Sequence, residues 1–239
     1  MAGSKRIHAG FWINYDETFS PVARFESLRL LLALATLEDW EIHQMDVKST
    51  FLNGLLDDEI YVEQASGFVD PDHPNKACLL HKAIYGLKQA SRAWNLQLHG
   101  VLLDLGFKRA DSDAGVYHRQ DDGGTLIIIL YADDITILGD NLSCVNKLKS
   151  TLSNRYEMTD LSEIDSYLGV RIKRNRSARR LEVDQSHYAL EIVNCFRLSD
   201  ANPARTPLPG LPTGAEVHLD KYDGQASPAD IKLFQASSR

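Results

Sequence analysis

The spacing of apolar and polar residues along the chain predicts a mixture of helices and antiparallel strands. Apolar side chains that recur every three or four positions indicate amphipathic helices, and β-branched or alternating runs indicate strands. Helices are predicted at 25–38, 88–107, 141–156 and 185–196, and strands at 41–47, 59–64, within 115–139, 166–174 and 179–185. Helices and hairpins do not alternate regularly, so we predict an α+β fold with helices packed on one face of an antiparallel sheet.

The character of the chain changes after Leu198. Five of its eight prolines follow this residue: Pro203, Pro207, Pro209, Pro212 and Pro228. A segment of this composition buries too little apolar surface to form its own core, so we expect an extended tail at 199–239. The tail follows a folded domain at 14–198 and a divergent N-terminal segment at 1–13.

Charge and composition exclude several classes of protein. The net charge of −7 argues against a protein that coats nucleic acid, because such domains are usually basic. One local basic patch, "RIKRNRSARR" at 171–180, is either a nucleic-acid contact or a solvated hairpin turn. No apolar run is long enough to span a bilayer, so we expect no membrane partner. Three cysteines without a CxxC pair indicate reduced thiols in an intracellular protein.

Two adjacent aspartates, Asp133 and Asp134, stand between β-branched runs in "LIIILYADDITILG". Two like charges about 4 Å apart repel by roughly 1 kcal/mol in water. A surface turn would carry this cost without function, whereas a metal site would use it. Neighbouring side chains of a strand point to opposite faces, so we predict a hairpin with the aspartate pair at its tip. Asp46, in the apolar strand at 41–47, is the best third ligand for Mg²⁺, which prefers oxygen donors.

Blocks of sequence surround these aspartates in a specific order. They are "YDETFSPVARFESLRLLLALA", "HQMDVKSTFLNG", "EIYVEQASGF", "IYGLKQASRAW", "YADD", "YLGV" and "ARTPL", from about Asn14 to Leu208. This text resembles the reverse transcriptases of copia-type retrotransposons, whose YxDD box matches "YADD". The resemblance implies an RNA-directed DNA polymerase with a palm, partial fingers and the beginning of a thumb. It implies catalysis and metal binding by Asp46, Asp133 and Asp134, with Mg²⁺ or Mn²⁺ as the cofactor.

The same resemblance implies binding roles for residues around the aspartates. It places the deoxynucleoside triphosphate against Phe51, Gln89 and Val47, with Phe51 excluding a ribose 2′-hydroxyl. It places a primer on an RNA or DNA template against Tyr131, Tyr167, Leu168, Gly169, Lys88, Arg92, Arg171, Lys173 and Arg174. Considered without the family, Phe51 is equally a core aromatic, and Lys88 and Arg92 belong to a solvated helix face.

The chain departs from the family at both ends. The family has a "KARLVA"-like basic strand before "YDETFSP", and "MAGSKRIHAGFWIN" stands there instead. We therefore interpret the chain as a truncated part of a polyprotein that also holds RNase H and integrase segments and acts in a cytoplasmic virus-like particle. We expect poor nucleotide incorporation from this chain. The alternative is an inactive relic that folds as a palm and at most binds nucleic acid. A palm-like nucleotidyl cyclase would not predict Phe51, Gln89 and "YLG" together.

Overall fold

The computed structural model of the protein describes residues 18–200. The predicted N-terminal segment at 1–13 and the tail beyond residue 200 lie outside this range. The described residues form two units. The first unit runs to Tyr167 and resumes at Ile172–Val183, and the second consists of Leu168–Arg171 and the residues from Asp184 onwards.

The first unit is built on a six-stranded sheet whose neighbouring strands are all antiparallel, as predicted. The strands lie in the order β4 (Lys108–Arg109), β5 (Val116–Asp121), β6 (Gly124–Tyr131), β7 (Asp134–Gly139), β1 (Glu41–Val47) and β8 (Met158–Glu163). The apolar pattern misses β8, because all its residues after Met158 are exposed. A strand without a buried face has no apolar period to detect.

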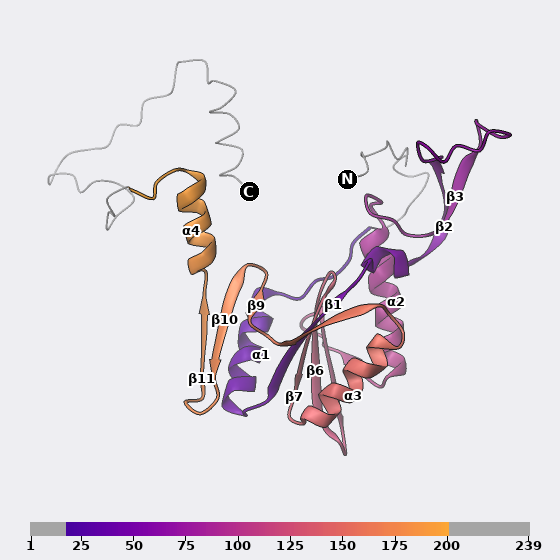
Figure 1. Ribbon diagram of the computed structural model, residues 1–239. Helices are drawn as coiled ribbons and strands as arrows, with labels where there is room; N and C mark the ends of the chain where they lie inside the picture. Colours follow the sequence, from indigo (N-terminus) through magenta and orange to yellow (C-terminus); the bar gives the residue numbers. More distant parts are fainter. Residues whose placement is uncertain (1–17, 201–239) are drawn as a thin grey trace, which may run out of the picture. The chain divides into compact units, whose positions relative to one another are not determined.

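Helices cover both faces of this sheet (Figure 1). The helices of the described chain are α1 (Phe25–Leu37), α2 (Ala90–Asp104), α3 (Leu142–Ser153) and α4 (Ser186–Cys195). Helices α2 and α3 pack on one face around Trp94, Ile128 and Leu148. Helix α1 packs on the other face around Leu28 and Ile129. The prediction of a single covered face is therefore wrong for α1, because the central strands are buried on both sides.

Asp113 fixes the start of α1. Its Oδ2 accepts hydrogen bonds from the backbone N–H of Arg24 at 2.9 Å and the hydroxyl of Ser27 at 2.5 Å. Burial tends to raise the pKa of the Asp113 carboxyl, but these hydrogen bonds outweigh it and the pKa is lowered. A Cβ on Gly115 would lie 2.3 Å from the backbone nitrogen of Ala23. Glycine at this position therefore lets the segment before α1 approach the sheet closely.

Smaller elements surround this framework. They are the 3₁₀ helix η1 (Thr50–Asn53), the hairpin of β2 (Leu55–Glu63) and β3 (Ala77–Lys82), and a three-stranded sheet of β9 (Ser166–Tyr167), β10 (Val170–Asn175) and β11 (Arg180–Asp184). The β2–β3 hairpin extends past the N-terminal end of α2 (Figure 1) and packs there around Ile60, Ala83 and Leu87. Helix α4 confirms the helix predicted at 185–196. Within residues 18–200, no helix is long and apolar enough to cross a membrane.

Candidate active site

The β6–β7 hairpin ends in a two-residue turn made of Ala132 and Asp133. Tyr131 and Asp134 form the last strand pair, so Asp134 is the first residue of β7. This corrects the prediction that both aspartates form the tip. Ala132 takes a left-handed conformation with a φ of 53°. The turn frees Asp133 from the strand geometry that would send neighbouring side chains to opposite faces.

Asp46 lies directly opposite Asp134 in the pairing of β1 with β7. Directly opposed residues of antiparallel strands point to the same face of the sheet. Gln44, two residues before Asp46, shares this face, and its Nε2 donates a hydrogen bond to Oδ1 of Asp134 at 3.0 Å. The structure therefore brings Asp46 and Asp134 together beside the turn that carries Asp133.

The three carboxylates interact unfavourably with one another. Burial raises the pKa of the Asp134 carboxyl above its ordinary value of 3.8, and the negative charges of Asp133 and Asp46 add to this, while the hydrogen bond from Gln44 opposes it. Lys48, the cation closest to Asp46 in sequence, pairs instead with Glu157 at 2.9 Å. Within residues 18–200, the lysine and arginine ion pairs all involve other carboxylates. No lysine or arginine of residues 18–200 therefore forms an ion pair with the cluster.

These donors fit a hard divalent cation by their chemistry. Mg²⁺ is commonly bound by one or two carboxylates that leave its other positions to water and substrate phosphates. Asp46 and Asp134 offer such a pair, with Asp133 next to them. Among the described residues, however, no three His, Cys, Asp or Glu side chains are already grouped to hold a metal ion. The convergence of all three carboxylates on a metal stays a prediction.

The chain turns sharply after Val47 and thereby positions Phe51. Ser49 takes a left-handed conformation with a φ of 51°, and the hydroxyl of Thr50 donates to the carbonyl of Val47 at 2.6 Å. The turn leads into η1, where the rings of Phe51 and Tyr85 meet edge-on with centroids 4.7 Å apart. Phe51 is partly buried against two apolar clusters, so its ring is fixed by packing.

The side chain of Val47 is 3% exposed and belongs to the core beneath α2. A nucleotide contact at this residue, as predicted, is therefore limited to its backbone. The Val47 N–H donates to the carbonyl of Asp133 at 3.3 Å. This bond ties the turn of the β6–β7 hairpin to β1.

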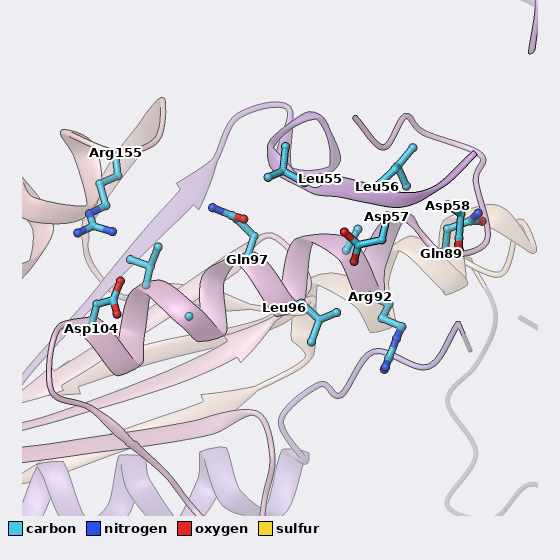
Figure 2. Close-up of a pocket in the computed structure, with 13 residues that line it drawn as sticks. Leu55, Leu56, Asp57, Asp58, Gln89, Arg92, Leu96, Gln97, Asp104 and Arg155 are labelled. Atoms are coloured by element: carbon cyan, nitrogen blue, oxygen red, sulfur yellow. The ribbon is translucent and has the colours of Figure 1, made fainter. Parts of the chain in front are cut away.

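Gln89 stands at the N-terminus of α2 and is 5% exposed. Neither its Nε2 nor its Oε1 has a hydrogen-bond partner in the described part of the chain. Buried amides are normally paired, so this one requires an explanation. Gln89 borders a pocket of about 620 Å³ between α2 and β2 (Figure 2). Its other polar lining residues are Asp57, Asp58, Arg92, Gln97, Asp104 and Arg155.

The pocket beside α2 is distinct from the carboxylate cluster. Arg92 lines it and donates from Nη1 to the carbonyl of Phe19 at 3.4 Å, while Lys88 is exposed. None of the three aspartates is part of its lining. The structure therefore brings Gln89 and Arg92 together, but not with Asp46 and Asp134.

The predicted primer-binding residues fall in both units. In the first unit, the rings of Tyr131 and Tyr167 meet at 76° with centroids 6.3 Å apart. Tyr167 is 3% exposed, and burial, followed by the charge of Asp134, raises the pKa of its hydroxyl. In the second unit, Leu168 and Gly169 both have positive φ, at 49° and 77°. Their contact with a primer stays a prediction.

The basic segment at 171–180 is largely used inside the protein. Arg174 donates to the carbonyl of Trp40 at 2.6 Å and contacts Asp39 at 3.1 Å, and its side chain is 11% exposed. Its predicted contact with template or primer is therefore not supported. Arg171 forms a two-pronged ion pair with Asp184, and Lys173 is exposed. Among the predicted contacts Arg171, Lys173 and Arg174, Lys173 is the residue that this geometry leaves accessible to nucleic acid.

Two residues of the site are absent from the sequence-based prediction. Gln44 is a buried polar residue in an apolar strand, on the same face as Asp46, and that pattern is the signal that could have found it. Trp94 occupies an apolar position of the helix predicted at 88–107. Its indole Nε1 donates to the carbonyl of Ala132 at 3.0 Å. No sequence pattern predicts that bond, because the two residues meet only in the folded chain.

Several known proteins are similar to this chain in sequence. A family model described as reverse transcriptase (RNA-dependent DNA polymerase) matches residues 6–209. The retrovirus-related Pol polyprotein from transposon TNT 1-94 of Nicotiana tabacum is 38% identical over 199 residues, which are 83% of this chain and 15% of that protein. The corresponding polyprotein from transposon RE1 of Arabidopsis thaliana is 37% identical over 200 residues, 84% of this chain and 14% of that protein. A putative transposon Ty5-1 protein of Saccharomyces cerevisiae is 35% identical over 164 residues, 69% of this chain and 53% of that protein.

Proposed function

The chain belongs to the reverse transcriptase (RNA-dependent DNA polymerase) family, in its copia-type branch, and on that premise we propose that it adds deoxynucleotides to a primer on an RNA or DNA template. It spans only 14–15% of the two plant polyproteins, which contain far more than this domain. One observation carries the proposal: Asp46 and Asp134 face each other beside Asp133, and no cation of the described chain neutralises them. Nucleotidyl transfer by divalent cations requires such carboxylates.

In this proposal Asp46, Asp133 and Asp134 hold Mg²⁺ or Mn²⁺. When bound, the cations stabilise charge on the attacking and leaving oxygens of the phosphoryl group. Gln44 orients Asp134 through its hydrogen bond to Oδ1. The short turn of Ala132 and Asp133 brings the third carboxylate to the same end of the sheet.

Phe51 and Gln89 are assigned to the incoming nucleotide. The ring of Phe51 is held edge-on by Tyr85 just after the strand that carries Asp46, and a fixed ring supports a role in rejecting a 2′-hydroxyl. The unpaired amide of Gln89 supports a role in which the ligand or the template supplies its missing hydrogen bonds. Tyr131, Tyr167 and Lys173 are assigned to the primer and template.

A primer-extension assay tests the proposal. The chain is incubated with an oligo(dT) primer on poly(rA), thymidine triphosphate and Mg²⁺ or Mn²⁺, and the product length is measured. We expect weak extension, in line with the poor incorporation predicted from the sequence, that depends on the metal and is lost in Asp133→Asn, an exposed turn position where the substitution leaves the fold intact. Extension that persists in Asp133→Asn would remove this residue from the mechanism. Absence of extension by the unmodified chain, with its fold intact, would favour the inactive relic. Extension without added metal would contradict the metal-dependent mechanism.

A further inference from the structure

Trp94 connects the helix that follows Gln89 to the Ala132–Asp133 turn between β6 and β7. Its side chain is 2% exposed within the core beneath the sheet. From that position the indole Nε1 donates to the carbonyl of Ala132 at 3.0 Å. Core aromatics usually contribute by burying area, whereas this one also directs its single polar atom at the residue before Asp133.

Ala132 is the residue of this turn that needs support. Its φ of 53° lies in the left-handed region, which residues with a side chain adopt at a cost. Such conformations persist where surrounding contacts hold them, and they are common at functional sites. Two hydrogen bonds hold this turn: the indole N–H of Trp94 donates to the carbonyl of Ala132, and the N–H of Val47 donates to the carbonyl of Asp133.

The ring of Trp94 has little freedom to move. It meets the ring of Tyr156 at 78° with centroids 5.1 Å apart. The backbone of Trp94 is closely packed as well: a Cβ on Gly54 would lie 2.8 Å from the backbone nitrogen of Trp94, so the glycine lets the end of η1 rest directly on α2. The donor is therefore held on a rigid helix in contact with the turn that carries Phe51.

We propose that Trp94 is a positioning residue, which holds the Ala132–Asp133 turn in the conformation that presents Asp133 and Asp134 to a divalent cation. The inference rests on the metal-binding role proposed above. Trp94 itself lies in the core and touches no substrate. Its donor acts on the backbone of the turn, and through the turn on the two carboxylates.

The test compares Trp94→Phe with Trp40→Phe, the same change next to the opposite end of β1. Hydrogen exchange of the Val47 amide reports the turn, and exchange of the Ile137 amide in the β1–β7 ladder reports global stability. Loss of one neutral hydrogen bond corresponds to about fivefold. In Trp94→Phe we expect Val47 to exchange about fivefold faster relative to Ile137, and Mn²⁺ affinity, measured by electron paramagnetic resonance, to fall about fivefold. Trp40→Phe should change neither. Equal acceleration of the Val47 and Ile137 amides would overturn the inference, because it would show that Trp94 contributes only to the stability of the core.

Two further measurements keep the test decisive. Glycine adopts positive φ without steric cost, so adding Ala132→Gly to Trp94→Phe should recover part of the lost Mn²⁺ affinity.

In the unmodified chain, Mg²⁺ should shift the indole N–H resonance of Trp94 and leave that of Trp40 unchanged. An unshifted Trp94 resonance with Mg²⁺ bound overturns the inference even if the Phe variant does not fold. A chain that binds no metal at all contradicts the proposed function, and the ratio of Val47 to Ile137 exchange then still decides whether Trp94 holds the turn.

Discussion

Strand β1 carries an acidic cluster at each end, and the two clusters differ in the partners of their carboxylates. At its start, Glu41 lies close to Asp39, and Arg176 binds them at 2.8 and 2.9 Å. At its end, Asp46 lies opposite Asp134, which accepts a hydrogen bond from the neutral amide of Gln44. Arginines from the β10–β11 hairpin neutralise the first cluster, whereas no lysine or arginine within residues 18–200 pairs with the second.

The pKa shifts of the two clusters run in opposite directions. The hydrogen bond from Arg176, helped by its positive charge, lowers the pKa of the Asp39 carboxyl. Burial and the neighbouring carboxylates raise the pKa of Asp134. A similar pairing occurs beside Glu41, where the buried Lys149 binds Asp160 at 2.6 Å and His43 at 3.0 Å. A carboxylate that pairs with a cation stabilises the contact between two elements of the fold. Carboxylates without such a partner repel one another, and a bound cation can relieve this repulsion.

The largest expected effect comes from replacing one carboxylate at each end of β1 with an amide, in two separate variants. Asp46→Asn removes a proposed metal ligand, and primer extension should fall at least about a hundredfold, because electrostatic stabilisation of the transition state is lost. Glu41→Gln removes a carboxylate that pairs with Arg176 and lies 3.7 Å from Nε2 of His43, away from the aspartates, so extension should stay within about threefold. Primer-extension rates at saturating Mg²⁺ check both. Equal losses in the two variants would show that the ends of β1 do not differ in function.

This contrast shows what the sequence reveals and what it hides. The aspartate pair between β-branched runs is visible, because a charge there has no structural reason. The conformation of the turn is hidden, because Ala132 adopts a positive φ without the glycine or asparagine that usually announces one. Helix α1 covers the second face of the sheet because β6 is buried on both faces. The unbroken apolar run Leu126–Leu130 within β6 indicates this burial.

The basic segment shows the limit most clearly. Arg174 and Lys173 are adjacent and carry the same charge, so sequence alone assigns them the same role. In the fold, Arg174 reaches the carbonyls of Ala35 and Trp40 at the end of α1, more than 130 residues away in the chain, and Lys173 faces outward. Only the tertiary structure separates a cation that stabilises the fold from one that can contact a phosphate.

A second test separates these neighbours. Arg174→Met leaves two carbonyls and Asp39 without their buried donor, and should lower the free energy of unfolding by about 2 kcal/mol in urea titrations. It should leave affinity for a primer–template duplex unchanged. Lys173→Ala should do the reverse, with stability unchanged and a shallower dependence of log affinity on log salt. Weaker duplex binding by a folded Arg174→Met would restore Arg174 to the nucleic-acid interface.

A third test addresses the repulsion at the far end of β1. Because the folded pKa of Asp134 is raised, its contribution favours the folded state below the unfolded value of 3.8 and is lost as pH rises through the folded pKa. Asp134→Asn keeps the acceptor for Gln44 and removes the charge, so in metal-free buffer at pH 7 it should stabilise the protein by about 1 kcal/mol. Thermal unfolding with and without Mg²⁺ measures this. A destabilised variant would mean that Asp134 is paired after all.

The smallest expected effect belongs to Gln44, the neutral partner of Asp134. Its hydrogen bond lowers the pKa of the Asp134 carboxyl, so Gln44→Met raises that pKa and lets protons compete better with a cation. Mn²⁺ affinity should therefore fall about threefold at pH 6 and recover towards pH 8, since about 1 kcal/mol per hydrogen bond sets the scale. Ile42→Met, on the same strand and face, is the matched control and should leave the pH profile unchanged. An equal loss of Mn²⁺ affinity at pH 6 and pH 8 would mean that Gln44 affects the geometry of the site and not the protonation of Asp134.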